Sequence, residues 1–137
     1  NSLHVCGPDM TMHGVYHGVV ASSKLNDLYH QAKAVLLPSR IEGVGLSMVE
    51  GAMAGAIPIT CTDNPTAKEF GFEEFSADPS VDSYSMAMRV AMMDYTNKKQ
   101  RVSEIVQKQK LFDKFDKKTV AKKYIDFYED RFNSIGI

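Results

Sequence analysis

The sequence predicts an α/β domain in which helices flank a parallel β-sheet. Short apolar runs typical of strands alternate with segments of helical periodicity, in the order strand, helix, strand, helix, strand. Two of these runs, AVLLP at 34–38 and IPITC at 57–61, are almost continuously apolar, which is typical of parallel strands buried between helices. Each parallel connection needs a crossover, and the intervening segments are long enough to supply a helix.

The amino-terminal part supplies the first of these elements. LHVCG at 3–7 is predicted as a strand, and HGVYHGVV at 13–20 is a weaker strand candidate. Apolar residues then recur every three or four positions, which predicts an amphipathic helix over 24–33. The strand at 34–38 follows directly, and we expect it to be buried on both faces.

A glycine-containing loop leaves that strand and enters a helix predicted over 48–54, which Gly55 closes. The strand at 57–61 comes next. We expect TDNPTAKEFG at 62–71 to be a turn-rich loop, and FEEFSAD at 72–78 to hold one short strand.

Three helices are predicted to complete the chain, over 81–95, 98–111 and 118–132. We therefore place a single partial domain over 1–137, with 112–137 as its closing carboxy-terminal helix. Four methionines in the first of these helices are expected to fill gaps in the core: Met86, Met88, Met92 and Met93.

Composition and cysteine usage indicate a soluble globular protein. The 137 residues are 44% hydrophobic and 24% charged, and no apolar run is long enough to span a membrane, so we expect a cytoplasmic location. Cys6 and Cys61 have no CxxC spacing and are expected to be buried, reduced core residues. His13 and His17 lack a carboxylate that would complete a metal site, and no metal is expected.

The net charge of −1 hides an uneven distribution. Residues 1–94 carry 5 basic and 11 acidic side chains, whereas 95–137 carry 11 basic and 6 acidic ones. The lysines interleave with acidic residues at helical spacing, which is typical of a solvated helix face. We therefore expect no nucleic-acid binding, and at most a weak contact with a membrane surface.

The loop PSRIEGVG at 38–45 is the strongest candidate for a binding site. It leaves the carboxyl end of a predicted parallel strand and leads into a helix N-terminus, where backbone N–H groups and the helix dipole attract anions. Gly43 and Gly45 would allow a ligand to approach the backbone closely. A carboxylate facing a phosphate would be repelled, so Glu42 and Glu50 are expected to accept hydrogen bonds from flanking sugar hydroxyls.

Structural alternatives exist for both glutamates. Ser47 and Glu50 have the S-x-x-E spacing of a capping box, in which Glu50 would bond back to the backbone of Ser47. Glu42 could be a solvated loop charge paired with Arg40. The loop lacks the lysine of a P-loop, and Met48 stands where a dinucleotide-binding motif needs its third small residue.

At these residues the sequence resembles the retaining nucleotide-sugar glycosyltransferases of the GT-B fold, in the group 1 or family 4 type. The pattern PS..EGFGL..lEAMA.G.PV is typical of their carboxy-terminal domain, and this chain has the following residues in that order: Pro38, Ser39, Glu42, Gly43, Val44, Gly45, Leu46, Glu50, Gly51, Ala52, Met53, Ala54, Gly55 and Pro58. The similarity extends more weakly to the segments on both sides, and it implies a Rossmann-like domain, the carboxy-terminal half of a GT-B architecture.

The resemblance also implies roles for individual residues. Glu42 would belong to the catalytic site and bind donor-sugar hydroxyls, while the backbone at Gly43, Val44 and Gly45 would line that sugar. The N–H groups of Leu46 and Ser47 would meet the diphosphate, and Glu50 would hold the ribose hydroxyls. The substrate would be a UDP-, GDP- or ADP-sugar, with no other cofactor and no metal.

The chain also departs from the family pattern. Val44 replaces a usual Phe, Gly51 a usual Ala, and no Arg and Lys match the pair that clamps the diphosphate. An amino-terminal acceptor domain is missing from the 137 residues, so we expect this chain alone to be inactive. The alternatives are a non-catalytic nucleotide-sugar-binding or protein-interaction module that keeps the fold, and a different nucleotide-binding enzyme.

Overall fold

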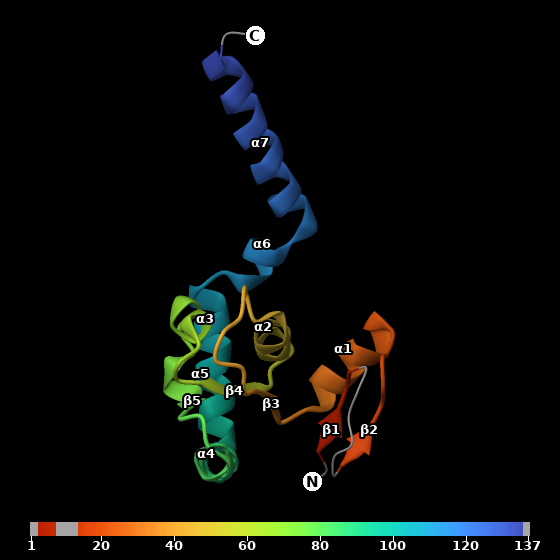
Figure 1. Ribbon diagram of the computed structural model, residues 1–137, viewed down its shortest axis with the longest axis vertical. Helices are drawn as coiled ribbons and strands as arrows, with labels where there is room; N and C mark the ends of the chain where they lie inside the picture. The colour runs from red at the N-terminus through yellow and green to blue at the C-terminus, as the bar shows by residue number, and fades with distance from the viewer. Residues whose placement is uncertain (1–2, 8–13, 136–137) are drawn as a thin grey trace.

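A three-stranded parallel sheet lies at the centre of the protein, whose computed structural model describes residues 3–7 and 14–135. Its strand order is β3 (Ala34–Leu37), β4 (Ile57–Cys61) and β5 (Ser76–Ala77). Helices pack against it, so the predicted α/β class with a parallel sheet flanked by helices is confirmed (Figure 1). β4 is buried along its whole length, as predicted for the strand at 57–61.

The predicted burial of β3 on both faces is wrong. β3 pairs only with β4 in this sheet, so it forms an edge, and the side chain of Leu36 stays 37% exposed. Its pairing runs from Ala34 opposite Ile57 to Leu37 opposite Thr60.

A second, smaller sheet is formed by the amino-terminal segment. β1 (His4–Val5) and β2 (Val15–Tyr16) pair in parallel, which confirms a strand in each of the two candidate segments. Cys6 follows β1 and is exposed, so its predicted burial is wrong, because it lies outside the three-stranded sheet. Cys61, in contrast, is buried in β4 as predicted.

Helices α1 (Ser22–Gln31) and α2 (Leu46–Met53) confirm the two helices predicted in this half of the chain, with ends shifted by about two residues. α2 packs against β3 and β4. α2 lies so close to β3 that a Cβ added to Gly51 would lie only 2.6 Å from a methyl carbon of Val35.

Gly55 closes α2, as predicted. Its φ of +89° is left-handed, and its N–H donates to the carbonyl oxygen of Ala52 at 2.9 Å. The N–H of Ala56 donates to the carbonyl oxygen of Gly51 at 2.9 Å. These two bonds are those of a Schellman motif, so α2 ends at a defined point before β4 begins.

The segment 62–71 is not a plain loop, which corrects the prediction. It contains the short helix α3 (Pro65–Glu69), with Asn64 as a bonded N-cap and Pro65 in the first turn. A 3-10 turn, η1 (Glu73–Phe75), then leads into β5, which is the short strand predicted within 72–78.

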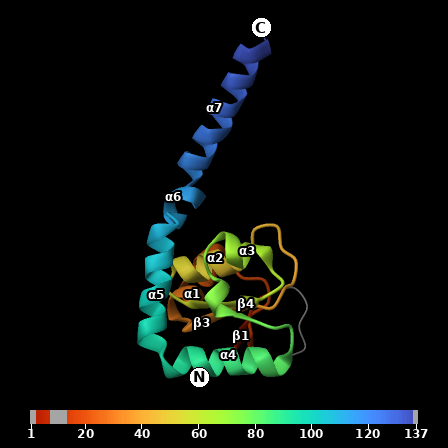
Figure 2. The same cartoon turned by 90° about the vertical axis from the view of Figure 1, so that its left-hand side faces the viewer.

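Four helices complete the chain, one more than predicted: α4 (Val81–Met93), α5 (Tyr95–Lys108), α6 (Leu111–Phe115) and α7 (Lys117–Ile135). Buried apolar side chains of α2, β4, α3 and α5 form one core cluster, to which Phe70, Phe72 and Phe75 contribute their rings. None of the side chains described in α7, those of residues 117–134, belongs to that cluster. α7 projects away from the rest of the protein in both views (Figures 1 and 2).

The predicted role of the methionines in α4 is wrong for three of the four. Met86 is 60% exposed and Met93 is 87% exposed, and Met88 is also exposed. Of the four, only Met92 packs against the core, to which α4 also contributes smaller side chains such as Ala87 and Ala91.

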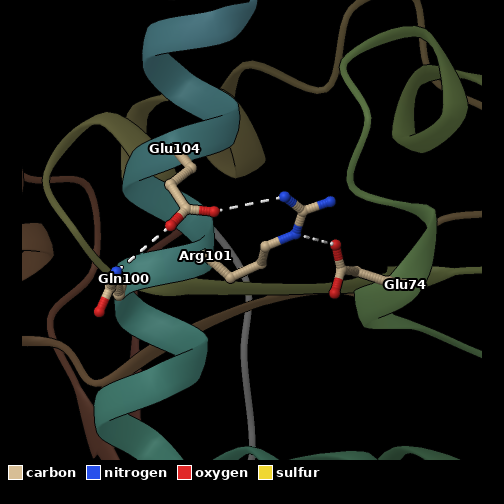
Figure 3. Close-up of polar contacts among 4 residues, drawn as sticks. All are labelled: Glu74, Gln100, Arg101 and Glu104. Atoms are coloured by element: carbon tan, nitrogen blue, oxygen red, sulfur yellow. Dashed lines mark hydrogen bonds and ion pairs between the residues drawn. The ribbon is translucent and has the colours of Figure 1, made fainter.

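A polar network joins α5 to the turn before β5 (Figure 3). The Arg101 guanidinium donates through Nε to Glu74 at 2.9 Å and through Nη1 to Glu104 at 3.4 Å. Gln100 also donates to Glu104, at 3.3 Å. All four side chains are exposed, so the network fixes the turn only weakly against competition from water and salt.

Candidate functional site

The loops that follow the three central strands meet at the carboxyl edge of the sheet. The Nδ2 of Asn64 donates to the carbonyl oxygen of Ser39 at 3.1 Å, which joins the loop after β4 to the loop after β3. The hydroxyl of Thr62 donates to Asp78, after β5, at 3.1 Å. Ligands of open α/β sheets bind at this edge, so the β3–α2 loop (residues 38–45) lies where a ligand is expected.

Gly45 sets the start of α2. It adopts φ +64° and ψ +48°, and its carbonyl oxygen accepts from the N–H groups of Met48 at 2.9 Å and Val49 at 3.3 Å. The N–H groups of Leu46 and Ser47 find no acceptor among the described residues. They are the unpaired donors of a helix N-terminus, which carries partial positive charge and suits an anion.

The predicted sugar-facing residues lie side by side in the β3–α2 loop. Glu42 is half-buried, while Gly43 and Val44 are exposed. A Cβ added to Gly43 would meet nothing within 4 Å, so open space adjoins the backbone there. Arg40 pairs with Asp63 at 3.4 Å, both side chains being exposed, which contradicts the alternative that Arg40 neutralises Glu42.

The capping box is not formed. α2 begins at Leu46 with Gly45 as N-cap, so Ser47 lies inside the first turn and caps nothing. The side chains of Ser47 and Glu50 instead approach the hydroxyl of Tyr29, on α1. Burial raises the pKa of Tyr29, the Glu50 carboxylate adds to the rise, and the Ser47 side chain opposes it. Glu50 itself is exposed and lies in the second turn of α2, four residues after Leu46.

The structure adds Asn64, which sequence reasoning missed. Its side chain is only 2% exposed although it is polar, and it bonds to both α3 and the β3–α2 loop. The sequence did contain a signal, because Asn followed by Pro is typical of a helix N-cap with proline in the first turn. Two acidic residues also follow β4: Asp63 pairs with Arg40, and Glu69 lies exposed at the end of α3.

Residues considered for other chemistry are placed elsewhere. Nδ1 of His4 and Nε2 of His17 lie 2.9 Å apart on the β1–β2 pair, and His13 lies outside the described residues. His30 is exposed on α1 and bonds to the carbonyl oxygen of Asn26. In the described ranges, no three His, Cys, Asp or Glu side chains are arranged to hold a metal ion. None of the helices described is long and apolar enough to cross a bilayer.

Comparisons with known proteins give one match. No curated protein and no solved structure matches the chain significantly. Residues 12–109 match the family model described as glycosyl transferases group 1. That range holds the β3–α2 loop, the helix that follows it and all three strands of the central sheet. The chain therefore belongs to the glycosyl transferases of group 1, as the carboxy-terminal Rossmann-like part of a GT-B fold.

Proposed function

We propose that this chain is the donor-binding domain of a retaining glycosyltransferase, and that the β3–α2 loop with the first turns of α2 holds a nucleoside diphosphate sugar. Domains of this family bind nucleotide sugars. The observation that carries the proposal is the free helix N-terminus at Leu46 and Ser47, at the carboxyl edge of the sheet and beside open space at Gly43.

Each site residue has a distinct part in this proposal. The N–H groups of Leu46 and Ser47 bind the diphosphate, and the backbone from Gly43 to Gly45 lines the sugar. Glu42 accepts hydrogen bonds from hydroxyls of the sugar. Glu50 accepts them from the ribose, a role that the absence of the capping box leaves open to it.

The chemistry follows from these positions. The bond between the anomeric carbon and the phosphate oxygen breaks, an acceptor hydroxyl bonds to that carbon on the same face of the sugar, and its proton passes to the departing diphosphate oxygen. Negative charge grows on the departing diphosphate, and donors that are already oriented towards it stabilise that charge most effectively. The acceptor itself is bound by another part of the enzyme, so we propose that this chain alone does not turn over.

Calorimetric titration tests the binding proposal. The wild-type protein is titrated with UDP, GDP and ADP, and then with their sugar conjugates. We expect weak binding of one nucleotide, with the sugar conjugate binding more tightly than the nucleotide alone. If none of these ligands binds, the proposal is wrong.

Two alanine variants separate the roles of the glutamates. Glu50→Ala should weaken nucleotide and conjugate alike, about tenfold or more, because it removes charged hydrogen-bond acceptors from the ribose. Glu42→Ala should weaken only the conjugate. Glu129→Ala, a matched change on the exposed face of α7, should leave both affinities unchanged. Unchanged affinity in Glu50→Ala would overturn the ribose contact.

A further inference from the structure

Asn64 bonds in two directions from a buried position. Its Oδ1 accepts from the Thr66 N–H at 3.0 Å and from the Thr66 hydroxyl at 2.6 Å, which caps α3. Its Nδ2 donates to the carbonyl oxygen of Ser39 at 3.1 Å, across 25 residues of sequence. One carboxamide therefore satisfies a helix terminus and also holds the first turn of the β3–α2 loop.

Thr66, which bonds to Asn64, also lies beside Gly45 at the other end of the β3–α2 loop. The Thr66 hydroxyl oxygen lies 3.0 Å from the position that a Cβ on Gly45 would occupy. Thr66 is itself 2% exposed, and its hydroxyl is directed to Asn64. The Asn64–Thr66 pair therefore contacts both ends of the segment that carries Glu42. Asn64 bonds to Ser39 at one end, and Thr66 packs beside Gly45 at the other.

We propose that Asn64 is a positioning residue for the donor site. It holds the loop from Ser39 to Gly45 in the conformation that directs the Leu46 and Ser47 N–H groups towards the phosphates, and it touches no substrate atom itself. This inference rests on the proposed function. Its physical basis is preorganisation: a loop already held in its binding conformation loses less conformational entropy when the ligand arrives.

A second side-chain interaction between these loops, an ion pair, is weaker. Arg40 and Asp63 pair at 3.4 Å, but their side chains are 64% and 54% exposed, so water and salt screen the attraction. The Asn64 bond to Ser39 is partly buried, and leaving a buried carbonyl without its donor is costly. The loop should therefore respond to Asn64 far more than to Arg40.

Two substitutions remove the donor to Ser39 while keeping the cap of α3. Asn64→Ser introduces an uncharged side chain, and serine caps helices about as well as asparagine. Asn64→Asp keeps the shape and the cap but has no N–H to give, so it serves if the smaller serine leaves a destabilising cavity. Asn133→Ser, on the exposed end of α7, is the matched control.

Amide hydrogen exchange without ligand is the first measurement. Loop exchange is read at the Met48 and Val49 amides, which donate to the Gly45 carbonyl at the end of the loop. We expect it to rise about tenfold in Asn64→Ser, while the amides of α3 and α5 and the melting temperature stay close to wild type. Nucleotide affinity, measured for UDP, GDP and ADP, should fall by a similar factor. Asn64→Asp should show the same rise in loop exchange; its affinity is not compared, because salt screens the charge of a residue that is 2% exposed only poorly.

The outcomes separate this proposal from the one on which it rests. Unchanged loop exchange in both folded variants overturns the role of Asn64, whatever the affinity. A uniform rise in exchange across all helices also overturns it, because Asn64 would then only stabilise the fold. If wild-type protein binds no nucleotide, the proposed donor site is wrong, and a local rise in loop exchange would support Asn64 as a loop anchor alone.

Discussion

Tyr84 places a phenol hydroxyl in the interior between α4 and the central sheet. The hydroxyl oxygen is inaccessible to solvent and has no hydrogen-bond partner of ordinary geometry in the described part of the chain. Burial, with a further contribution from the neighbouring thiol of Cys61, raises the pKa of Tyr84 to about 12. The neutral phenol is therefore the form that the folded protein favours.

Stability should accordingly fall at high pH. The unfolded chain ionises Tyr84 near pH 10 and the folded chain near pH 12, so the stabilising contribution is complete below pH 10 and is lost as the pH rises towards 12. Denaturant melts of wild type and Tyr84→Phe over this range test the sign. The variant should lose less stability between pH 10 and 12, and an identical pH dependence would contradict the raised pKa.

Among individual residues, the sequence identifies candidate site residues when the neighbouring sequence alone marks them. Glu42, Gly45 and Glu50 stood out because glycines and carboxylates follow an apolar strand and precede a helix. Asn64 could not be linked to Ser39 in the same way, because their contact spans 25 residues and depends on the pairing of β3 with β4. Long-range hydrogen bonds of this kind leave no periodicity to read.

Among the elements, α2 and β3 show how one missing side chain sets a packing distance. A Cβ on Gly51 would lie 2.6 Å and 2.9 Å from two carbons of Val35, closer than such atoms come. Gly51 is therefore required by Val35, although glycine weakens the interior of a helix.

A double-mutant cycle tests this coupling. Gly51→Ala alone should cost about 1–3 kcal/mol of stability through overpacking, despite the better helix propensity of alanine. In a Val35→Ala background the 2.6 Å contact with the methyl carbon is gone while the 2.9 Å contact with Cβ remains, so the same change should cost less without becoming neutral, with a coupling energy of about 1 kcal/mol. Denaturant unfolding measures all four proteins, and additive effects would show that the two side chains do not compete for space.

α7 begins at a charged cap. The Asp116 carboxylate accepts from the Thr119 N–H at 2.8 Å, and this bond is the main reason that the pKa of Asp116 lies below its usual value of 3.8. Because the folded pKa is lowered, the cap is fully formed above pH 3.8 and is lost as the pH falls through the folded value.

The Thr119 amide proton reports this cap directly. Its chemical shift, followed by NMR, should titrate with a midpoint below 3.8, and the first turn of α7 should fray over the same range. Asn caps helices without titrating in this range, so Asp116→Asn should abolish the titration while keeping the turn. A Thr119 shift that still titrates in Asp116→Asn would rule out this cap as its cause.

Element prediction succeeded where packing agreed with periodicity. The strand at 57–61 and the helices at 24–33 and 48–54 are all present within about two residues. α3 was missed because five residues are too few to show a helical period, and its cap and proline resemble turn signals. The methionines of α4 were misplaced because composition does not say which face of a helix meets the sheet.

For the molecule as a whole, α7 is the outlying feature. Residues 121–134 are all exposed, including an apolar side that comprises Tyr124, Ile125, Phe127, Tyr128 and Phe132. Periodicity predicted this helix but not its position, since an amphipathic pattern gives no information about what lies against the apolar side.

Removing residues 117–137 should therefore leave the remaining fold nearly as stable as before. The core cluster contains none of the side chains described for 117–134, so the melting temperature of the truncated chain should stay within a few degrees of the full chain. Circular dichroism should show loss of helix without loss of the cooperative transition. A non-cooperative melt would show that α7 supports the core.

The projecting helix also governs how the molecule scatters and diffuses. A 19-residue helix is about 28 Å long, whereas a compact domain of this size has a radius of gyration of about 14 Å. In dilute solution the monomer should therefore give a radius of gyration clearly above 14 Å, and a distance distribution with a long tail. In hydrodynamic terms, this small domain should sediment like an elongated particle.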